Sequence, residues 1–384
     1  MQYRKLGLLV ITCLITLSGC TSKYDASKDN IDRYKTTTIV NNNESKETTS
    51  GDGLSSKRLS YELTDNLKID AEVEYTGTSN CDTYHAKVKE FDADIITNAF
   101  IQDMDKMKKV ENPNGLELTG DDGSSLFIGE GRFSYTSSVA EQDILYLLQG
   151  AYYSELQYQK DRANADELVQ EKVVQKAIKK VETVCELEKD ETVNLLVGMK
   201  VDANRVLERQ QLEMEKMDLQ SSIDIGKFHE VTEDMISDEC YYLVLGIVKN
   251  RIPLMGTQEP ALITADEDAI YQSTYIELFI DGESIRDINV MGMFTLEIQN
   301  TEELISAEEA CETIREKYDM QILSESYTID KVWLEYIYVP DTQADNMYTQ
   351  GNIQPYWCFA ITNEEGSYGE RVNAVTGGDL AYGE

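Results

Sequence analysis

Apolar and polar residues alternate along much of the first third of the chain. Residues 59–75 (LSYELTDNLKIDAEVEY) and 83–91 (TYHAKVKEF) show the two-residue period of a strand with one buried face. Residues 116–137 continue the alternation, with turns expected at Asp121-Asp122-Gly123 and at Gly129–Gly131. This pattern predicts antiparallel strands.

A helical period replaces the alternation in the middle of the chain. Ile144, Leu147 and Leu148 lie at helical spacing, and Asn164 with Glu167 has the form of a capped helix start. Both signals indicate helices that pack one apolar side against the rest of the protein. Helices are expected within residues 91–107, 144–152, 164–184 and 204–217, and a strand over residues 191–206.

The strand pattern returns after residue 226 and surrounds one further helix. Ser306 and Glu309 form a capping box, and the helix after them has one apolar side. That side consists of Ala307, Ala310, Cys311, Ile314 and Tyr318. Strand hairpins are expected over residues 239–256, over residues 275–299 with a turn at Asp281-Gly282, and over residues 355–378 with a turn at residues 363–366. A single strand, ended by Pro340, is expected over residues 331–340.

The order of these elements predicts an α+β fold in two halves. Residues 59–225 would form an N-terminal domain and residues 226–384 a C-terminal domain. In each half an antiparallel sheet would pack against helices that lie on one side of it.

The start of the chain has the pattern of a secretory signal. Arg4 and Lys5 precede about fourteen mostly apolar residues, which as a helix would reach only about 21 Å, too short for a hydrocarbon core of about 30 Å. Leu17, Ser18 and Gly19 followed by Cys20 resemble the bacterial lipobox. This resemblance implies cleavage after residue 19 and attachment of fatty acyl chains, such as palmitate, to Cys20. Two acyl chains would anchor the protein firmly in the membrane; an ordinary signal peptide is the alternative.

Residues 20–58 are rich in Ser, Thr, Asn, Asp and Lys and have few large apolar side chains. Such a segment cannot bury enough surface to offset its ordering entropy, so a disordered spacer is expected. The whole chain carries 35 basic and 71 acidic residues, a net charge of −36. Nucleic acid would be repelled by this charge, whereas basic partners would be attracted.

Cysteine and histidine are sparse. Five cysteines follow Cys20, and their wide spacing does not indicate a disulfide framework, although one or two disulfides stay open as an alternative. Buried thiols are expected instead. These residues are Cys81, Cys185, Cys240, Cys311 and Cys358.

Patterns typical of catalytic and metal sites are missing from the sequence. His85 lies four residues after Cys81, and on a regular strand both would face one side, but zinc needs three or four ligands. His229 is followed by Glu230 without the second histidine of a zinc protease motif. No metal, no cofactor and no enzymatic activity are therefore expected.

Aromatic residues are the remaining candidates for a binding surface. Tyrosine occurs 23 times, and four aromatic residues gather on the last strands: Tyr336, Tyr338, Tyr356 and Trp357. They could form an exposed platform for a sugar or a peptide. The alternative, which tyrosine and tryptophan in strands favour, is packing in the core and on the sheet.

The last 80 residues resemble a known group of proteins. The segments LISAEEACETIREKY, VWLEYIYV, QPYWCFAI and RVNAVTGGDL are similar to the C-terminal part of PepSY-like and YycI/YycH-type extracytoplasmic regulatory domains of Gram-positive bacteria. The whole chain resembles uncharacterised Clostridia-type surface lipoproteins. The positions that carry the likeness are Ser306, Glu309, Ala310, Pro355, Trp357, Phe359, Asn373, Ala374, Thr376 and Gly377.

This resemblance implies regulation through protein contacts at the membrane and no catalytic residue. The chain departs from the YycI/YycH arrangement, which uses a transmembrane helix. We therefore expect a non-enzymatic lipoprotein on the outer face of the cytoplasmic membrane that binds another envelope protein and regulates it. The alternative is a binding module for a small molecule, a peptide or a cell-wall glycan.

Overall fold

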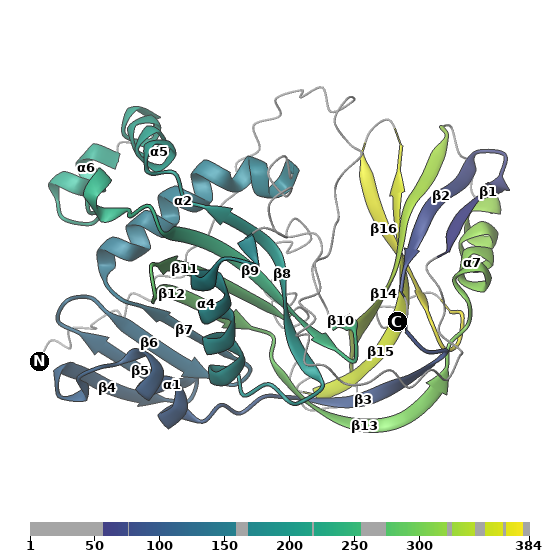
Figure 1. Ribbon diagram of the computed structural model, residues 1–384, viewed down its shortest axis with the longest axis horizontal. Coiled ribbons are helices and arrows are strands. Elements are labelled where there is room, and N and C mark those ends of the chain that lie inside the picture. The colour runs from purple at the N-terminus through teal and green to yellow at the C-terminus, as the bar shows by residue number, and fades with distance from the viewer. Residues whose placement is uncertain are drawn as a thin grey trace, which may run out of the picture. The chain divides into compact units, whose positions relative to one another are not determined.

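The computed structural model describes residues 57–75, 77–158, 168–216, 219–254, 274–320, 325–341, 350–363 and 366–378. These residues form a mixed α+β fold around one sheet of sixteen strands, which confirms the predicted fold class (Figure 1). Within the described ranges, no helix combines the length and the apolar character that crossing a bilayer requires.

Twelve strands follow one another across the sheet, and four more pair beside this path. The order is β13 (Phe294–Glu303), β3 (Asn80–Val88), β15 (Gln350–Thr362), β14 (Tyr327–Pro340), β10 (Ile252–Leu254), β9 (Cys240–Lys249), β11 (Tyr275–Asp281), β12 (Ser284–Met291), β7 (Arg132–Thr136), β6 (Ser125–Gly129), β5 (Gly115–Gly120) and β4 (Met107–Asn112). Beside the path, β1 (Arg58–Thr64) pairs with β2 (Leu67–Glu74), β2 with β14, β16 (Ser367–Asn373) with β15, and β8 (Glu191–Lys200) with β9.

Strands from both predicted halves hydrogen bond to each other. Strand β3 lies between β13 and β15, β7 pairs with β12, and β8 pairs with β9. Strand β2 is parallel to β14, as is the short β10, whereas the other pairs are antiparallel. The sheet is therefore shared across residues 225 and 226, and the domain boundary there stays a prediction.

Helices cover both faces of the strands around β9. On one face, Val181 of α4 (Lys172–Val184) belongs to the same buried cluster as Leu243 and Leu245. On the other face, α2 (Val139–Tyr158) and α5 (Ala203–Lys216) enclose a second cluster with Tyr242 and Val244. Since successive side chains of a strand point to opposite faces, β9 is buried on both sides. The remaining helices are α1 (Ala93–Phe100), α6 (Leu219–Asp224) and α7 (Ala307–Asp319).

Helix α7 forms as the sequence predicts. The Ser306 hydroxyl accepts a hydrogen bond from the Glu309 N–H at 3.1 Å, and the Glu309 carboxylate accepts one from the Ser306 N–H at 2.7 Å. This capping box satisfies two N–H groups that a helix start leaves unpaired. All five residues of the predicted apolar side are buried.

The helix predicted over residues 164–184 is interrupted before α4. Residues 169–171 form turns and a bend, and the regular helix starts at Lys172 after Glu171, whose side chain makes no capping hydrogen bond. The predicted cap at Asn164 lies outside the described residues. The predicted turn at Asp281-Gly282 is confirmed, and Gly282 adopts the positive φ of 55° that it requires. Strands β15 and β16 pair as the predicted closing hairpin, and residues 364–365 of its turn lie outside the described residues.

Candidate functional site

The structure corrects the prediction of an exposed aromatic platform. Tyr336, Tyr338, Tyr356 and Trp357 are at most 4 % exposed. The Trp357 Nε1–H donates to the Ile305 carbonyl oxygen at 3.0 Å. These aromatic side chains pack in the core on the faces of the sheet and are therefore not available to a ligand.

The predicted alignment of Cys81 and His85 on one face of β3 is also wrong. Cys81 is buried and His85 is exposed. The neighbouring Thr83 and Tyr84 are both buried at the point where β13 carries a bulge, so the alternation changes phase between them. Across the described part of the chain, no group of three metal-ligating side chains occurs.

His229 has a structural partner. Its Nδ1 lies 2.9 Å from Asp143 Oδ2, and its backbone N–H donates to the same oxygen at 2.8 Å. The carboxylate thus joins α2 to the segment that follows α6. The pair holds two elements together without a third group that would complete a metal site or a nucleophile.

All five cysteines within the described ranges are buried and unpaired. Burial raises the pKa of the Cys81 thiol to about 11 and raises that of Cys358 well above its usual value. Because the thiolate is the reactive form, these side chains behave as small apolar groups. The Leu17–Cys20 motif and residues 20–56 of the predicted 20–58 spacer lie outside the described residues, so lipidation stays a prediction. The spacer ends slightly earlier than predicted, because Arg58 begins β1.

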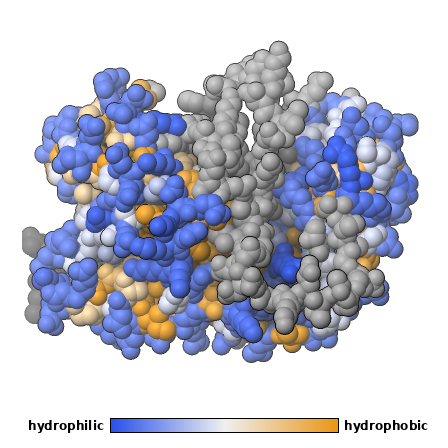
Figure 2. Space-filling view, in the orientation of Figure 1, coloured by the Kyte–Doolittle hydropathy of each residue, from blue (hydrophilic) through white to orange (hydrophobic). Residues whose placement is uncertain are grey.

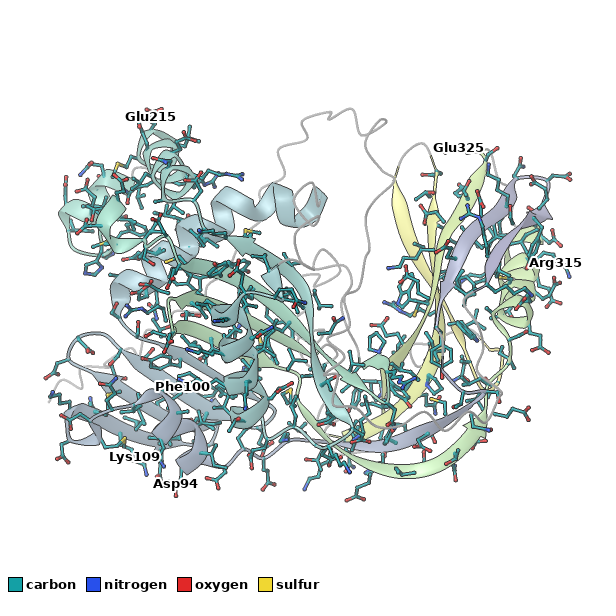
Figure 3. The ribbon with its side chains drawn as sticks, in the orientation of Figure 1. Asp94, Phe100, Lys109, Glu215, Arg315 and Glu325 are labelled. Atoms are coloured by element: carbon teal, nitrogen blue, oxygen red, sulfur yellow. The ribbon has the colours of Figure 1, made fainter. Side chains whose placement is uncertain are left out.

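An accessible groove lies where α1 ends beside the β5–β6 turn. Its volume is about 390 Å³, and its wall includes Asp103, Asp121 and Asp122 as well as Lys106. Figure 3 labels Phe100 at this end of α1 and Lys109 on the outer strand β4. The sequence indicates the turn and the helix, but their approach depends on the order of strands β4 to β7, so the groove was not foreseen.

The floor of the groove is aromatic. The rings of Phe100 and Tyr135 stack with their centroids 4.7 Å apart and their planes 25° from parallel. The Lys180 ammonium of α4 lies 4.5 Å from the centroid of the Phe100 ring. Helix α1 sets this position: the Asp92 carboxylate caps its start by accepting from the Asp94 N–H at 2.9 Å, and Ile96 and Phe100 on its buried side enter the core.

The rim of the groove is acidic and locally ordered. Asp122 accepts hydrogen bonds from the Ser124 hydroxyl at 2.6 Å and N–H at 2.9 Å, which lower the pKa of the Asp122 carboxyl. A Cβ atom at Gly120 would lie 2.4 Å from the Ser124 Oγ, so a larger residue here would displace the Ser124 side chain. Lys106 lies 3.1 Å from Asp103. With three carboxylates and one ammonium group, the rim attracts cations.

A buried carboxyl pair lies on the α2 side of the sheet. Asp287 accepts from the Thr136 hydroxyl at 2.5 Å, and Glu277 accepts from the Tyr275 hydroxyl at 2.6 Å. Burial, helped by the charges of Glu277 and Glu141, raises the pKa of Asp287 to about 7, although the Thr136 hydrogen bond lowers it. Both carboxyl groups belong to residues no more than 6 % exposed, so they join strands and do not face a ligand in solution.

Glu335 forms a second buried carboxyl centre. Its Oε2 accepts from the Trp333 Nε1–H at 3.3 Å and from the Cys358 thiol at 3.5 Å. Burial raises the pKa of Glu335 to about 7, although the nearby Arg371 guanidinium lowers it. Since Glu335 is only 2 % exposed, its hydrogen bonds serve the packing of β14 against β15.

Comparisons with known proteins bear on the fold alone. No protein-family model matches the sequence, and a comparison with curated proteins finds no match. A solved structure of similar fold is the 1.45 Å crystal structure of an uncharacterized protein from Eubacterium rectale ATCC 33656. The likeness has a TM-score of 0.51 and 13 % sequence identity, and it covers 83 % of this chain and 92 % of that chain.

Proposed function

We propose that this protein is a non-enzymatic lipoprotein on the outer face of the cytoplasmic membrane. It would bind a basic segment of another envelope protein in the groove beside α1. The observation that supports the proposal most strongly is the three-carboxylate rim above the Phe100–Tyr135 floor. Regulation of the bound protein is part of the proposal and rests on the PepSY-like pattern around Ser306 and Trp357.

The groove suits a lysine or arginine side chain. An ammonium or guanidinium group gains charge-assisted hydrogen bonds from the carboxylates of the rim, and the apolar stem of its side chain can pack against the aromatic floor. The net charge of −36 extends this attraction beyond the groove and would speed the encounter with a basic partner. Figure 2 shows that hydrophilic residues cover much of the visible described surface, in keeping with recognition by charge.

Binding fits the described residues better than catalysis does. A general acid or base must reach its substrate. Asp287 and Glu335, whose pKa values are raised to about 7, are buried outside the groove. Two carboxylates of the groove itself, Asp122 in a turn and Asp103 in a loop, accept local hydrogen bonds.

A free amine of low molecular weight is the second candidate ligand. The groove volume of about 390 Å³ lies near the lower end of the range of about 300–1,000 Å³ that small-molecule sites occupy. Such a ligand would use the same carboxylates and the same aromatic floor, and would need no partner protein.

Removal of the Cys20 thiol tests the anchor. In cells of the source organism, we expect Cys20→Ala to lose incorporation of radiolabelled palmitate and to leave the membrane fraction, because the acyl chains are attached at this sulfur. Cys13→Ala, which removes a thiol from the signal segment, is the matched control and should keep the label. A Cys20→Ala protein that still carries palmitate would refute the lipobox assignment.

The groove is tested by Asp121→Asn. We expect this variant to bind a lysine-rich peptide about tenfold more weakly in isothermal titration calorimetry, since a hydrogen bond to a charged group contributes about 1.5–3 kcal/mol. Glu117→Gln on the exposed face of β5 removes the same charge outside the groove and should lose less than twofold. Equal losses in the two variants would show attraction by net charge alone.

Photo-crosslinking identifies the class of ligand. A crosslinking amino acid in place of Gln102, which lines the groove, should capture one envelope protein through a basic segment on intact cells. If 1,5-diaminopentane binds the purified protein in an Asp121-dependent manner and no protein is captured, the free amine is the ligand and the partner-protein proposal fails.

A further inference from the structure

Strand β13 leaves one long edge of the sheet open. It is the first strand of the path, and among the described strands it pairs only with β3. Figure 1 shows β13 running along the outside of β3. Within the described ranges, no strand pairs with the backbone N–H and C=O groups on the other side of β13, and an unpaired edge is the arrangement that β-strand addition uses.

The side chains of β13 show where an additional strand would bury apolar surface. Phe294 and Leu296 point to the core and are 5 % and 8 % exposed, whereas Ile298, the next residue in the same row, is 66 % exposed. Ile298 lies directly opposite Tyr84, which is 1 % exposed. A strand paired with the outer edge of β13 would place an apolar side chain beside Ile298 and so bury it, as Phe294 and Leu296 are already buried.

The acidic residues of β13 indicate what kind of segment can pair with its outer edge. Glu297 and Glu303 are exposed and Glu302 is half-buried, so the strand carries three acidic residues. Two copies of β13 side by side would bring like charges together, which is unfavourable. A segment with lysine or arginine at alternate positions would instead meet opposite charges, and its apolar residues on the other face would pack against Ile298.

The bulge in β13 limits the length of the strand that can pair with its outer edge. The register shifts between Ile298 and Asn300, so the ladder is regular only over Phe294–Ile298 and again over Asn300–Glu303. Bulges at sheet edges reduce indiscriminate pairing with other strands. The edge therefore fits a short segment better than a long flat strand.

We propose that β13 is a docking edge for a short, extended, basic segment of a partner protein, which adds to the sheet as a strand beside Phe294–Glu303. The inference rests on the proposed function only in that both assign a protein partner. It does not depend on the groove, because the groove and β13 share no residue.

Hydrogen exchange of the full chain tests the docking edge. A synthetic peptide that alternates lysine with valine should slow amide exchange within residues 294–303 at least fivefold, because the outer N–H groups gain partners. A peptide with glutamate in place of lysine should give no protection. Absence of protection with the lysine peptide at millimolar concentration would overturn the proposal.

Two variants separate this edge from other sites. Ile298→Lys should weaken peptide binding at least fivefold, whereas Met320→Lys, at a residue 83 % exposed beyond α7, should leave it within twofold. In the Asp121→Asn variant, the lysine peptide should still protect the amides of β13 from exchange, even if the groove no longer binds the peptide. Protection confined to residues 100–124 would assign the peptide to the groove alone and overturn the docking edge. A dimer in sedimentation analysis that Ile298→Lys abolishes would assign the edge to a second copy of this chain.

Discussion

Replacement of Trp357 by alanine is expected to lower the free energy of unfolding by about 3–5 kcal/mol, the cost of removing a large buried aromatic side chain. Trp357 is 1 % exposed on β15. Its ring meets Tyr75 edge-on, with the centroids 6.1 Å apart. Truncation would leave a cavity in the core and would also leave the Ile305 carbonyl oxygen without the indole N–H.

Urea unfolding followed by far-ultraviolet circular dichroism measures this loss without relying on tryptophan fluorescence. Trp357→Phe keeps most of the ring volume and should cost less than the alanine variant, with the remaining loss due to the missing N–H donor. Met320→Ala, at an exposed apolar residue, should change stability by less than about 0.5 kcal/mol. A stable Trp357→Ala protein would mean that this side chain lies at the surface, as a binding platform requires.

Lys249→Met is the second substitution with a large expected effect. The Lys249 side chain is 2 % exposed, and its Nζ lies 2.8 Å from Glu188, 2.9 Å from Asp190 and 3.4 Å from Glu191. Burial lowers the pKa of Lys249, but the three carboxylates outweigh it and hold the pKa above its usual value. The ammonium group is therefore charged in the folded protein at neutral pH.

Methionine has a similar length but no charge. Glu191, whose side chain is 7 % exposed, would then be left beside two other carboxylates without the ammonium group. Breaking a buried ion pair by removing one partner costs about 3–5 kcal/mol, and the greater exposure of Glu188 and Asp190 places our expectation near the lower end. The measurement is the urea midpoint at pH 7.

An exposed lysine at the end of β8 provides the control for this substitution. Lys200→Met makes the same chemical change at an exposed position and should alter stability by less than about 0.5 kcal/mol. If the two variants lose the same amount, the cluster around Lys249 contributes no more than a surface charge does. Lys249→Arg should recover part of the loss only if the larger guanidinium group fits among the three carboxylates.

Local elements could be predicted because their signals lie within a few residues of one another. The capping box and the apolar side of α7 are contained in Ser306–Tyr318, and the turn of the β11–β12 hairpin is carried by Asp281 and Gly282. Each depends on hydrogen bonds or side-chain spacing inside one segment. The helix start at Lys172 was missed because its cap makes no side-chain hydrogen bond that a sequence pattern could reveal.

The candidate site could be predicted only in part. The Asp121-Asp122-Gly123 turn was expected, but the approach of this turn to Phe100 and Tyr135 was not, since it depends on which strands become neighbours. For the aromatic residues Tyr336 and Trp357, the sequence leaves a surface platform open beside the favoured core packing, because their spacing on a strand is the same in both. Their burial depends on strands far away in the chain.

By itself, the sequence determined the α+β class, the hairpins around residues 120–131 and 281–282, and the apolar side of α7. The tertiary structure alone decided that β3 enters between β13 and β15 and that β2 runs parallel to β14. These pairings join residues more than 200 positions apart, so no local signal specifies them. They are selected because together they bury the apolar side of β2 and of β3 in the core. The same selection creates the groove and leaves one side of β13 without a partner among the described strands.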